Sequence, residues 1–277
     1  SKVDEVIFGN VASPADASNV ARVIALQSGI PDSSIAQTVN RNCGSGMESI
    51  IAAWQAIREK RSEVIVAGGT ESMSNIPLLF HRNMTEWLLT MRSQRSWFGS
   101  FKTLLRFRPQ FLKPIIALEL GLTDPVSGLN MGQTAENLVV DFAISREEQD
   151  AFALSSHQKA HAAQQRCFLS GEILTSEDSV STLSGFEKDD GIRSDTTLAA
   201  LTGLKPRFQK QDGTVTVGNS CQITDGAASL LVAHPHRAAE MDLEPLGYIL
   251  DYAVAGCDPR RMGLGPVYAI TKLLKQT

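Results

Sequence analysis

The first part of the chain alternates between strand and helix patterns, and this order limits the folds that it can adopt. Short apolar runs at 3–8, 35–39 and 63–67 predict strands, and longer amphipathic stretches at 18–28 and 47–59 predict the helices between them. A β-α-β-α-β order predicts a mostly parallel sheet joined by right-handed crossovers. The expected fold class is therefore α/β.

The alternation stops after residue 75. In the long segment that follows, Ser145 with Glu148 three residues later predicts a capped helix that runs to about Phe168. Three later stretches again predict strands: 214–217, 227–233 and 246–254. With 277 residues and 43% hydrophobic content, the chain can bury a core in one domain or two.

A glycine-rich turn between the second predicted strand and the second predicted helix carries a cysteine. Residues 40–46 read Asn-Arg-Asn-Cys-Gly-Ser-Gly, with Cys43 just ahead of the helix. A thiol at a helix N-terminus lies near unpaired N–H groups and the positive end of the helix dipole, which favours the thiolate. Gly44 and Gly46 leave room for a carbonyl group to approach the sulfur. The turn predicts an acyl-accepting nucleophile, and the alternative is a small buried cysteine.

Composition narrows the remaining function classes. The formal net charge of −4 does not indicate a nucleic-acid partner. The four cysteines show neither CxxC pairing nor the density of a disulfide scaffold, which favours a reducing compartment. No apolar run approaches the ~20 residues of a membrane-spanning helix. His157 and His161 have the spacing of a metal-binding pair, but no third ligand converges with them in the sequence, so no metal is expected.

Five blocks, in order along almost the whole chain, resemble the thiolase family: residues 4–10, 39–46, 66–74, 131–137 and 217–228. The resemblance implies a layered αβα fold built from two similar α/β halves and a loop domain. The expected division is 1–75 for the first half, 76–207 for the loop domain, 208–245 for the return of the first half and 246–277 for the opening of the second. Because the chain starts at Ser1 and would hold little of the second half, we expect truncation at both ends.

The resemblance also implies an activity: thiolytic cleavage of 3-ketoacyl-CoA in fatty-acid β-oxidation. Cys43 would carry the acyl group and coenzyme A would be the co-substrate, with no metal or redox cofactor. Thiolases supply a histidine base, a second cysteine and an asparagine from the second half, which would lie beyond Thr277. The five histidines here match none of those motifs. This chain by itself is therefore expected to be inactive.

Six further residues fall where thiolases bind substrate. Arg193 aligns with a position at the nucleotide end of coenzyme A, where a guanidinium suits phosphate binding or adenine stacking. Met131 would border the thioester, and the pantetheine path would be lined by Leu201, Phe208, Val217 and Cys221. Core packing is the alternative role for each of these five side chains.

The segment 81–113 is strongly basic. It contains seven lysine or arginine residues and one acidic residue, Glu86, which gives a formal charge of +6. The rest of the chain carries a formal charge of −10. Around 92–106 the pattern is amphipathic: one face holds Trp97, Phe98, Phe101, Leu104 and Leu105, and the other holds Arg95, Lys102 and Arg106. Such helices often lie on anionic membranes or partner proteins. The alternative is a helix that covers the loop domain.

This segment resembles the corresponding stretch in β-subunits of the trifunctional complexes of fatty-acid oxidation. The expected partners of residues 92–108 are therefore a hydratase/dehydrogenase α-subunit, a membrane surface, or both. The resemblance further implies a homo-oligomer with the strand before Cys43 near the subunit contact. A bacterial cytoplasm or a mitochondrial matrix is the expected location.

Three other functions remain open at this point. A β-ketoacyl synthase shares the fold and a nucleophilic cysteine, but its sequence around the cysteine differs from that at 42–46, and the turn at 70–74 favours a thiolase. A biosynthetic thiolase that forms acetoacetyl-CoA would use the same residues. A non-catalytic, thiolase-like lipid-binding or scaffold subunit is permitted by the missing second half, although Cys43 argues against it.

Overall fold

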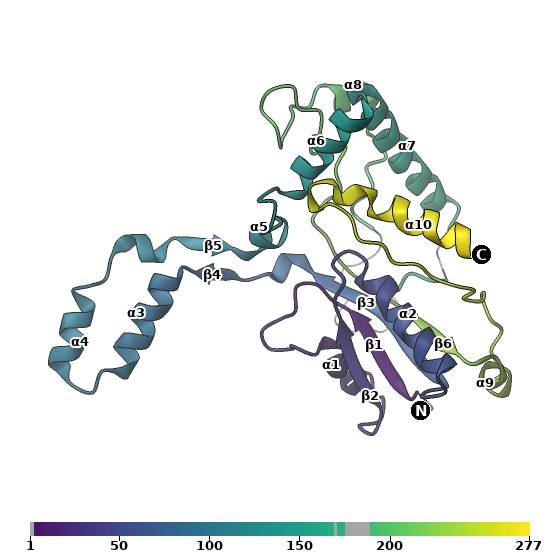
Figure 1. The fold of residues 1–277 in the computed structure, drawn as a ribbon, viewed down its shortest axis with the longest axis horizontal. Helices are drawn as coiled ribbons and strands as arrows, with labels where there is room; N and C mark the ends of the chain where they lie inside the picture. Colours follow the sequence, from purple (N-terminus) through teal and green to yellow (C-terminus); the bar gives the residue numbers. More distant parts are fainter. Residues whose placement is uncertain (1–2, 169–170, 175–188) are drawn as a thin grey trace. The chain divides into compact units, whose positions relative to one another are not determined.

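The computed structural model describes residues 3–168, 171–174 and 189–277, so part of the predicted loop domain 76–207 lies outside the described residues. The chain forms two compact units (Figure 1). The first unit contains residues 1–122 and 224–252, and the second contains 123–223 and 253–277. The four-part division predicted from the sequence stays a prediction.

The first unit is built on a four-stranded sheet in the order β2-β1-β3-β6. Its strands are β1 (Glu5–Gly9), β2 (Ile35–Val39), β3 (Val64–Ser72) and β6 (Asp225–Ala233). The strands β2, β1 and β3 run parallel, and β6 pairs antiparallel with β3 along its whole length. The predicted α/β class and the mostly parallel sheet are confirmed.

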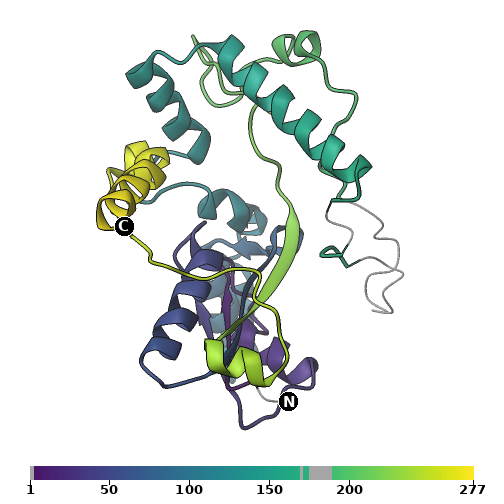
Figure 2. The ribbon, with the colours of Figure 1, turned by 90° about the vertical axis from the view of Figure 1, so that its right-hand side faces the viewer.

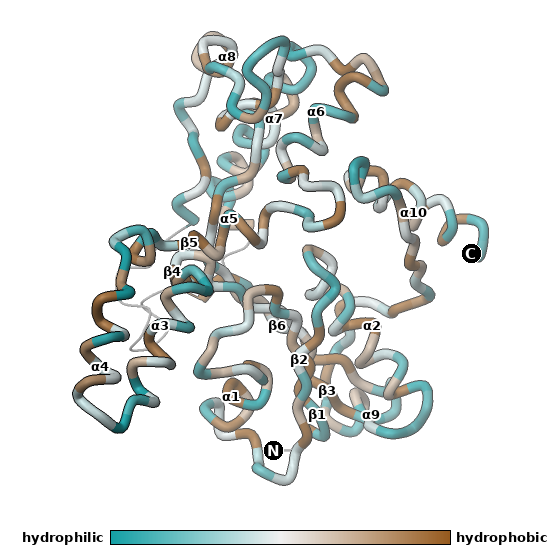
Figure 3. Tube along the Cα trace, turned by 60° about the vertical axis from the view of Figure 1, so that its left-hand side comes forward, coloured by the Kyte–Doolittle hydropathy of each residue, from teal (hydrophilic) through white to brown (hydrophobic). Residues whose placement is uncertain are grey.

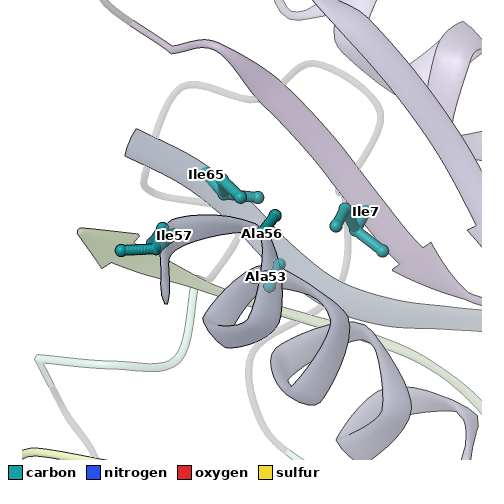
Figure 4. Close-up of a cluster of buried hydrophobic side chains, with 6 residues drawn as sticks. Ile7, Ala53, Ala56, Ile57 and Ile65 are labelled. Atoms are coloured by element: carbon teal, nitrogen blue, oxygen red, sulfur yellow. The ribbon is translucent and has the colours of Figure 1, made fainter. Parts of the chain in front are cut away.

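Two helices cover opposite faces of this sheet: α1 (Val20–Gln27) and α2 (Ser45–Arg58) (Figure 2). Successive side chains of a strand point to opposite faces. Val6 and Phe8 of β1 accordingly pack with Ala21 and Ala25 of α1. Ile7 faces the other way, into a buried cluster with residues of α2 and β3: Ala53, Ala56, Ile57, Ile65 and Ala67 (Figure 4). The first unit is therefore layered α-β-α around the sheet.

The segment between β3 and the second unit forms a separate excursion of the first unit (Figure 1). Its base is a pair of antiparallel strands, β4 (Leu78–Phe80) and β5 (Pro114–Ile116). Between them lie α3 (Arg82–Ser93), α4 (Trp97–Leu104) and the 3-10 helix η2 (Pro109–Leu112). The amphipathic stretch 92–106 is thus not one helix, because the chain is extended at Gln94 and restarts where the Ser96 hydroxyl accepts the N–H of Gly99.

Helices make up most of the regular structure of the second unit: α6 (Met131–Phe142), α7 (Arg146–Gln165), α8 (Leu198–Thr202) and α10 (Gly265–Gln276), with the 3-10 helix η4 (Pro259–Leu264). The remaining elements belong to the first unit: η1 (Met73–Asn75), α5 (Ala117–Gly121) and α9 (Pro235–Glu240). The predicted capping box is confirmed, since Ser145 and Glu148 exchange hydrogen bonds at the start of α7. That helix ends at Gln165 rather than near Phe168.

Two predicted strands are absent from the described structure. At 214–217 the backbone N–H groups of Thr214 and Val215 donate to the carboxylate of Glu136, so they have no donor left for a neighbouring strand. The stretch 246–254 pairs with no described strand, and Leu246, Tyr248 and Leu250 are largely exposed. Both strand predictions were wrong. None of the described helices is long and apolar enough to cross a bilayer.

Candidate active site

Cys43 lies between the end of β2 and the start of α2, as the sequence predicts, and its side chain is exposed. Gly44 is the N-cap of α2 and has no side chain that could cap the first turn. The exposed thiol therefore immediately precedes a helix N-terminus, where unpaired N–H groups attract negative charge. The alternative of a buried structural cysteine is wrong for this residue.

Cys43 follows β2 and therefore lies at the carboxyl edge of the parallel strands. A close contact between β1 and the start of α2 fixes the position of the helix that follows Cys43. A β-carbon added to Gly9, at the end of β1, would lie 2.3 Å from the carbonyl carbon of Ser45. Only glycine at this position allows the start of α2 to rest directly on β1. The hydroxyl of the fully buried Ser49 then donates to the Gly68 carbonyl of β3 at 2.7 Å. The start of α2 is thus anchored on two strands.

Charged and polar groups hold the segments beside the cysteine. Arg41 forms a two-point ion pair with Glu48 of α2, at 2.6 and 2.9 Å. The hydrogen bond and the negative charge of Glu48 raise the pKa of the Arg41 guanidinium. At the end of β3, the Glu71 carboxylate accepts the backbone N–H of Val11 at 2.9 Å, tying the loop after β1 to that strand.

Hydrogen bonds also join the start of β6 to the end of β3 and the turn that follows it. The carboxylate of Asp225 accepts the backbone N–H of Ser74 at 2.9 Å and also the hydroxyls of Ser74 and Ser72. The Ser74 hydrogen bonds, supported by that of Ser72, lower the pKa of Asp225. This carboxylate therefore stays ionised and acts here as a hydrogen-bond acceptor.

The six substrate-binding candidates all belong to the second unit. Leu201 is buried, and its Cδ2 would lie 2.7 Å from a β-carbon added to Gly218, the residue after the exposed Val217. Cγ of Phe208 would lie 2.1 Å from a β-carbon added to Gly132, the residue after Met131. Leu201 and Phe208 thus lie against the backbone next to two other candidates in sequence, and the predicted roles of all six stay predictions.

Arg193 and Cys221 are exposed and lie on neighbouring segments. The side chain of Gln222 donates to the carbonyl of Gly191 at 2.6 Å, and the backbone N–H of Arg193 donates to Nδ1 of His157 at 3.2 Å. His157 thereby serves as a hydrogen-bond acceptor for the Arg193 loop. Within the described ranges no three His, Cys, Asp or Glu side chains are arranged to hold a metal ion.

The sequence reasoning missed a buried polar network that shapes the segment 214–220. Asp150 of α7 has no exposed surface and accepts Nε of Arg146 at 2.8 Å and Nδ2 of Asn219 at 3.0 Å. Arg146 also donates to the carbonyl of Leu201 at 2.6 Å, and the Asn219 amide oxygen accepts the N–H of Thr216 at 2.7 Å. The ion pair of this network could have been predicted, because Arg146 and Asp150 lie four residues apart on one helix. The sequence offers no such local indication for the Asn219 hydrogen bond.

Comparison with known proteins gives the fold a family. Residues 1–236 match the family model for the N-terminal domain of thiolase. A protein of Staphylococcus aureus (strain NCTC 8325 / PS 47) named probable acetyl-CoA acyltransferase is 39% identical over 281 aligned positions, which include 100% of this chain and 66% of that protein. This chain therefore spans just under two thirds of the length of that relative.

Solved structures similar to this chain are also thiolases. A thiolase from Ascaris suum in complex with coenzyme A superposes with a TM-score of 0.83 at 32% identity, over 100% of this chain and 65% of that one. Human mitochondrial 3-ketoacyl-CoA thiolase in complex with CoA gives 0.80 at 38% identity, over 98% and 63%. The sequence blocks, the Cys43 turn and these matches lead to one conclusion: the chain belongs to the thiolase family.

Proposed function

We propose that Cys43 is the acyl-accepting nucleophile of a 3-ketoacyl-CoA thiolase that acts in fatty-acid β-oxidation. The observation that carries this proposal is an exposed thiol directly ahead of a helix N-terminus, in a chain of the thiolase family. The human relative bound to CoA is named a 3-ketoacyl-CoA thiolase, which supports the substrate class. Relatives named acetyl-CoA acyltransferase support acyl transfer in general.

The reaction divides into two balanced steps. The sulfur of Cys43 attacks the 3-keto carbon and forms a thioester, while the bond between C2 and C3 breaks and acetyl-CoA leaves as its enolate, which takes up a proton. The thiol of a second coenzyme A then attacks that thioester, and the Cys43 thiol is released. The thioester of the substrate stabilises the enolate, so the proposal needs no metal or redox cofactor.

Coenzyme A is proposed to lie along the second-unit candidates. Arg193 would meet its nucleotide end, and the pantetheine arm would follow Phe208, Val217 and Cys221 towards Met131. The exposure of Arg193, Val217 and Cys221 supports access, whereas the burial of Leu201 favours a packing role for that side chain. Homo-oligomer formation through β2, which is an end strand of the described sheet, belongs to the same proposal. A bacterial cytoplasm is proposed as the location, with a mitochondrial matrix as the alternative, because the relatives include a Staphylococcus protein and a human mitochondrial thiolase.

The 277-residue chain by itself is expected to be inactive. The base, the second cysteine and the asparagine that the resemblance implies match none of the predicted motifs of this chain, so the activation of Cys43 and the protonation of the leaving enolate both lack their protein groups. Purified chain should be mixed with acetoacetyl-CoA and CoA, and thiolysis followed by loss of the enolate absorbance. A chain longer at its C-terminus, covering the full length of a relative, is the positive control. Thiolase-like turnover by the 277-residue chain would contradict the expectation.

A second function, docking on an anionic lipid surface, is favoured by the excursion at 81–113. The apolar side chains of α4 are 52–76% exposed: Trp97, Phe98, Phe101, Leu104 and Leu105. Figure 3 shows the apolar stretches along α4. Thr103 is the buried residue of α4, and it lies against α3, where Nε1 of Trp87 donates to the carbonyl of Thr103 at 2.8 Å. Exposed aromatic rings beside a net charge of +6 suit an interface rich in anionic headgroups.

Replacing Trp97, Phe98 and Phe101 together with serine is expected to reduce binding to vesicles of phosphatidylglycerol by at least about tenfold, because each buried ring contributes more than 1 kcal/mol. Co-sedimentation against vesicles of pure phosphatidylcholine measures the electrostatic share. Phe152→Ser is the matched control, since Phe152 is an equally exposed aromatic residue of the second unit. Unchanged vesicle binding by the triple variant would contradict lipid docking. It would favour a protein partner for the apolar face of α4, such as a hydratase/dehydrogenase α-subunit.

A further inference from the structure

The backbone that carries Cys43 adopts an uncommon conformation. Asn42, the residue before it, has a φ of +47° and lies in the left-handed region. A residue other than glycine adopts this region at an energetic cost, so surrounding interactions must hold it there. On one side, the Asn40 side chain accepts the N–H of Asn42 at 2.9 Å and donates to the carbonyl of Val11 at 3.2 Å.

On the other side, a hydroxyl spans the turn beside two backbone hydrogen bonds, in which the N–H groups of Gly44 and Ser45 donate to the carbonyls of Arg41 and Asn42, each at 3.0 Å. Oγ of Ser45 accepts the backbone N–H of Arg41 at 2.8 Å and donates to the carbonyl of Asn42 at 2.6 Å. That carbonyl belongs to the peptide group that joins Asn42 to Cys43. Ser45 is only 4% exposed, so water cannot readily replace its hydroxyl.

The hydroxyl is itself fixed to the sheet. Ser45 is the first residue of α2, and its backbone rests on Gly9 of β1. One turn later, Ser49 ties the same helix to β3. A displacement of Arg41 or of the peptide group between Asn42 and Cys43 away from the start of α2 would therefore break at least one hydrogen bond of the Ser45 hydroxyl. Loss of the exposed Arg41–Glu48 ion pair would cost little by comparison.

We propose that Ser45 is a positioning residue: its hydroxyl holds the left-handed turn at Asn42 and so keeps the Cys43 sulfur at the mouth of α2. The inference rests on the proposed function for its effect on turnover, because a nucleophile gains its rate from a fixed direction of attack. The placement of the thiol can be measured without any acyl transfer. The two proposals can therefore fail separately.

The test is the rate at which iodoacetamide alkylates Cys43 in the 277-residue chain, read from the mass of the peptide that contains Cys43. Ser45→Ala is expected to slow this reaction by about tenfold, because the turn no longer holds the Cys43 sulfur in its exposed position ahead of α2. Ser34→Ala removes another buried hydroxyl of the first unit, which donates to the carbonyl of Val3 at 2.7 Å and lies outside the turn, and is expected to react at the rate of the unaltered chain.

A pair of isosteric variants separates the hydroxyl from packing. Ser45→Thr keeps the hydrogen bonds and is expected to retain most of the alkylation rate, whereas Ser45→Val has the same shape without the hydroxyl and is expected to match Ser45→Ala. Equal rates for the threonine and valine variants, or equal slowing by Ser34→Ala, would overturn the proposal. So would loss of folding in all Ser45 variants, because the hydroxyl would then serve the stability of the first unit. If an unaltered protein of the full length of a relative accepts no acyl group while Ser45→Ala slows alkylation, only the proposed function is refuted.

Discussion

In a protein extended at its C-terminus to the full length of a relative, replacing Cys43 with serine is expected to reduce acyl labelling by a radiolabelled 3-ketoacyl-CoA to background. A hydroxyl at this position keeps the size of the side chain, but it is a far weaker nucleophile than a thiol near a helix N-terminus. The exposed side chain touches no buried cluster, so the variant should fold like the unaltered chain. Label retained on the chain after denaturation and gel filtration is the measurement.

The matched control is Cys167→Ser, which removes another exposed cysteine that has no predicted role. It is expected to accept the label normally. Label that persists on Cys43→Ser but is lost from the control variant would assign acyl transfer to a different sulfur. Peptide mapping of the labelled chain distinguishes these cases, because the four cysteines lie far apart in the sequence.

Replacing Asp150 with alanine is expected to destabilise the second unit by about 3–5 kcal/mol, since it leaves the largely buried Arg146 guanidinium without its carboxylate partner. The same change removes one of the hydrogen bonds of the Asn219 side chain, which shapes the segment with Val217 and Cys221. Loss of order in that segment should therefore accompany the loss of stability.

Denaturant unfolding can assign this effect to one unit. All three tryptophans lie in the first unit, so their fluorescence reports on that unit, while far-ultraviolet circular dichroism reports on both. The expected result is an earlier transition by circular dichroism with unchanged fluorescence. Glu147→Ala, an exposed acidic residue on the same helix, is the control and should change stability by less than about 0.5 kcal/mol. Equal effects of the two variants would argue against a buried ion pair.

Elements fixed by nearby residues could be predicted from the sequence. The strand at 35–39 is confirmed residue for residue, because its apolar alternation ends at turn residues on both sides. The start of α7 is confirmed because Ser145 and Glu148 satisfy each other's backbone within one turn. The break between α3 and α4 also had a local signal, the capping residue Ser96, which the amphipathic pattern around it obscured.

Elements decided by distant residues could not be predicted. Residues 214–217 have the β-branched pattern of a strand, yet the Glu136 carboxylate, which is 78 positions from Thr214 in sequence, takes their N–H groups. No local pattern shows that this glutamate is buried. The same limit applied to the active-site turn: the motif pointed to Cys43, but the role of Ser45 follows only from the hydrogen bonds around it.

The short pairing of β4 with β5 has a consequence for how relatives of this chain can diverge. Leu78 and Ile116 are partners in that ladder, so the backbone leaves and re-enters the body of the first unit at one place. Lengthening or shortening what lies between them changes mainly the entropy of closing a loop, which varies slowly with loop length. Evolution can therefore exchange this appendage, and with it the surface that the protein recognises, while the chemistry at the sheet edge is inherited unchanged.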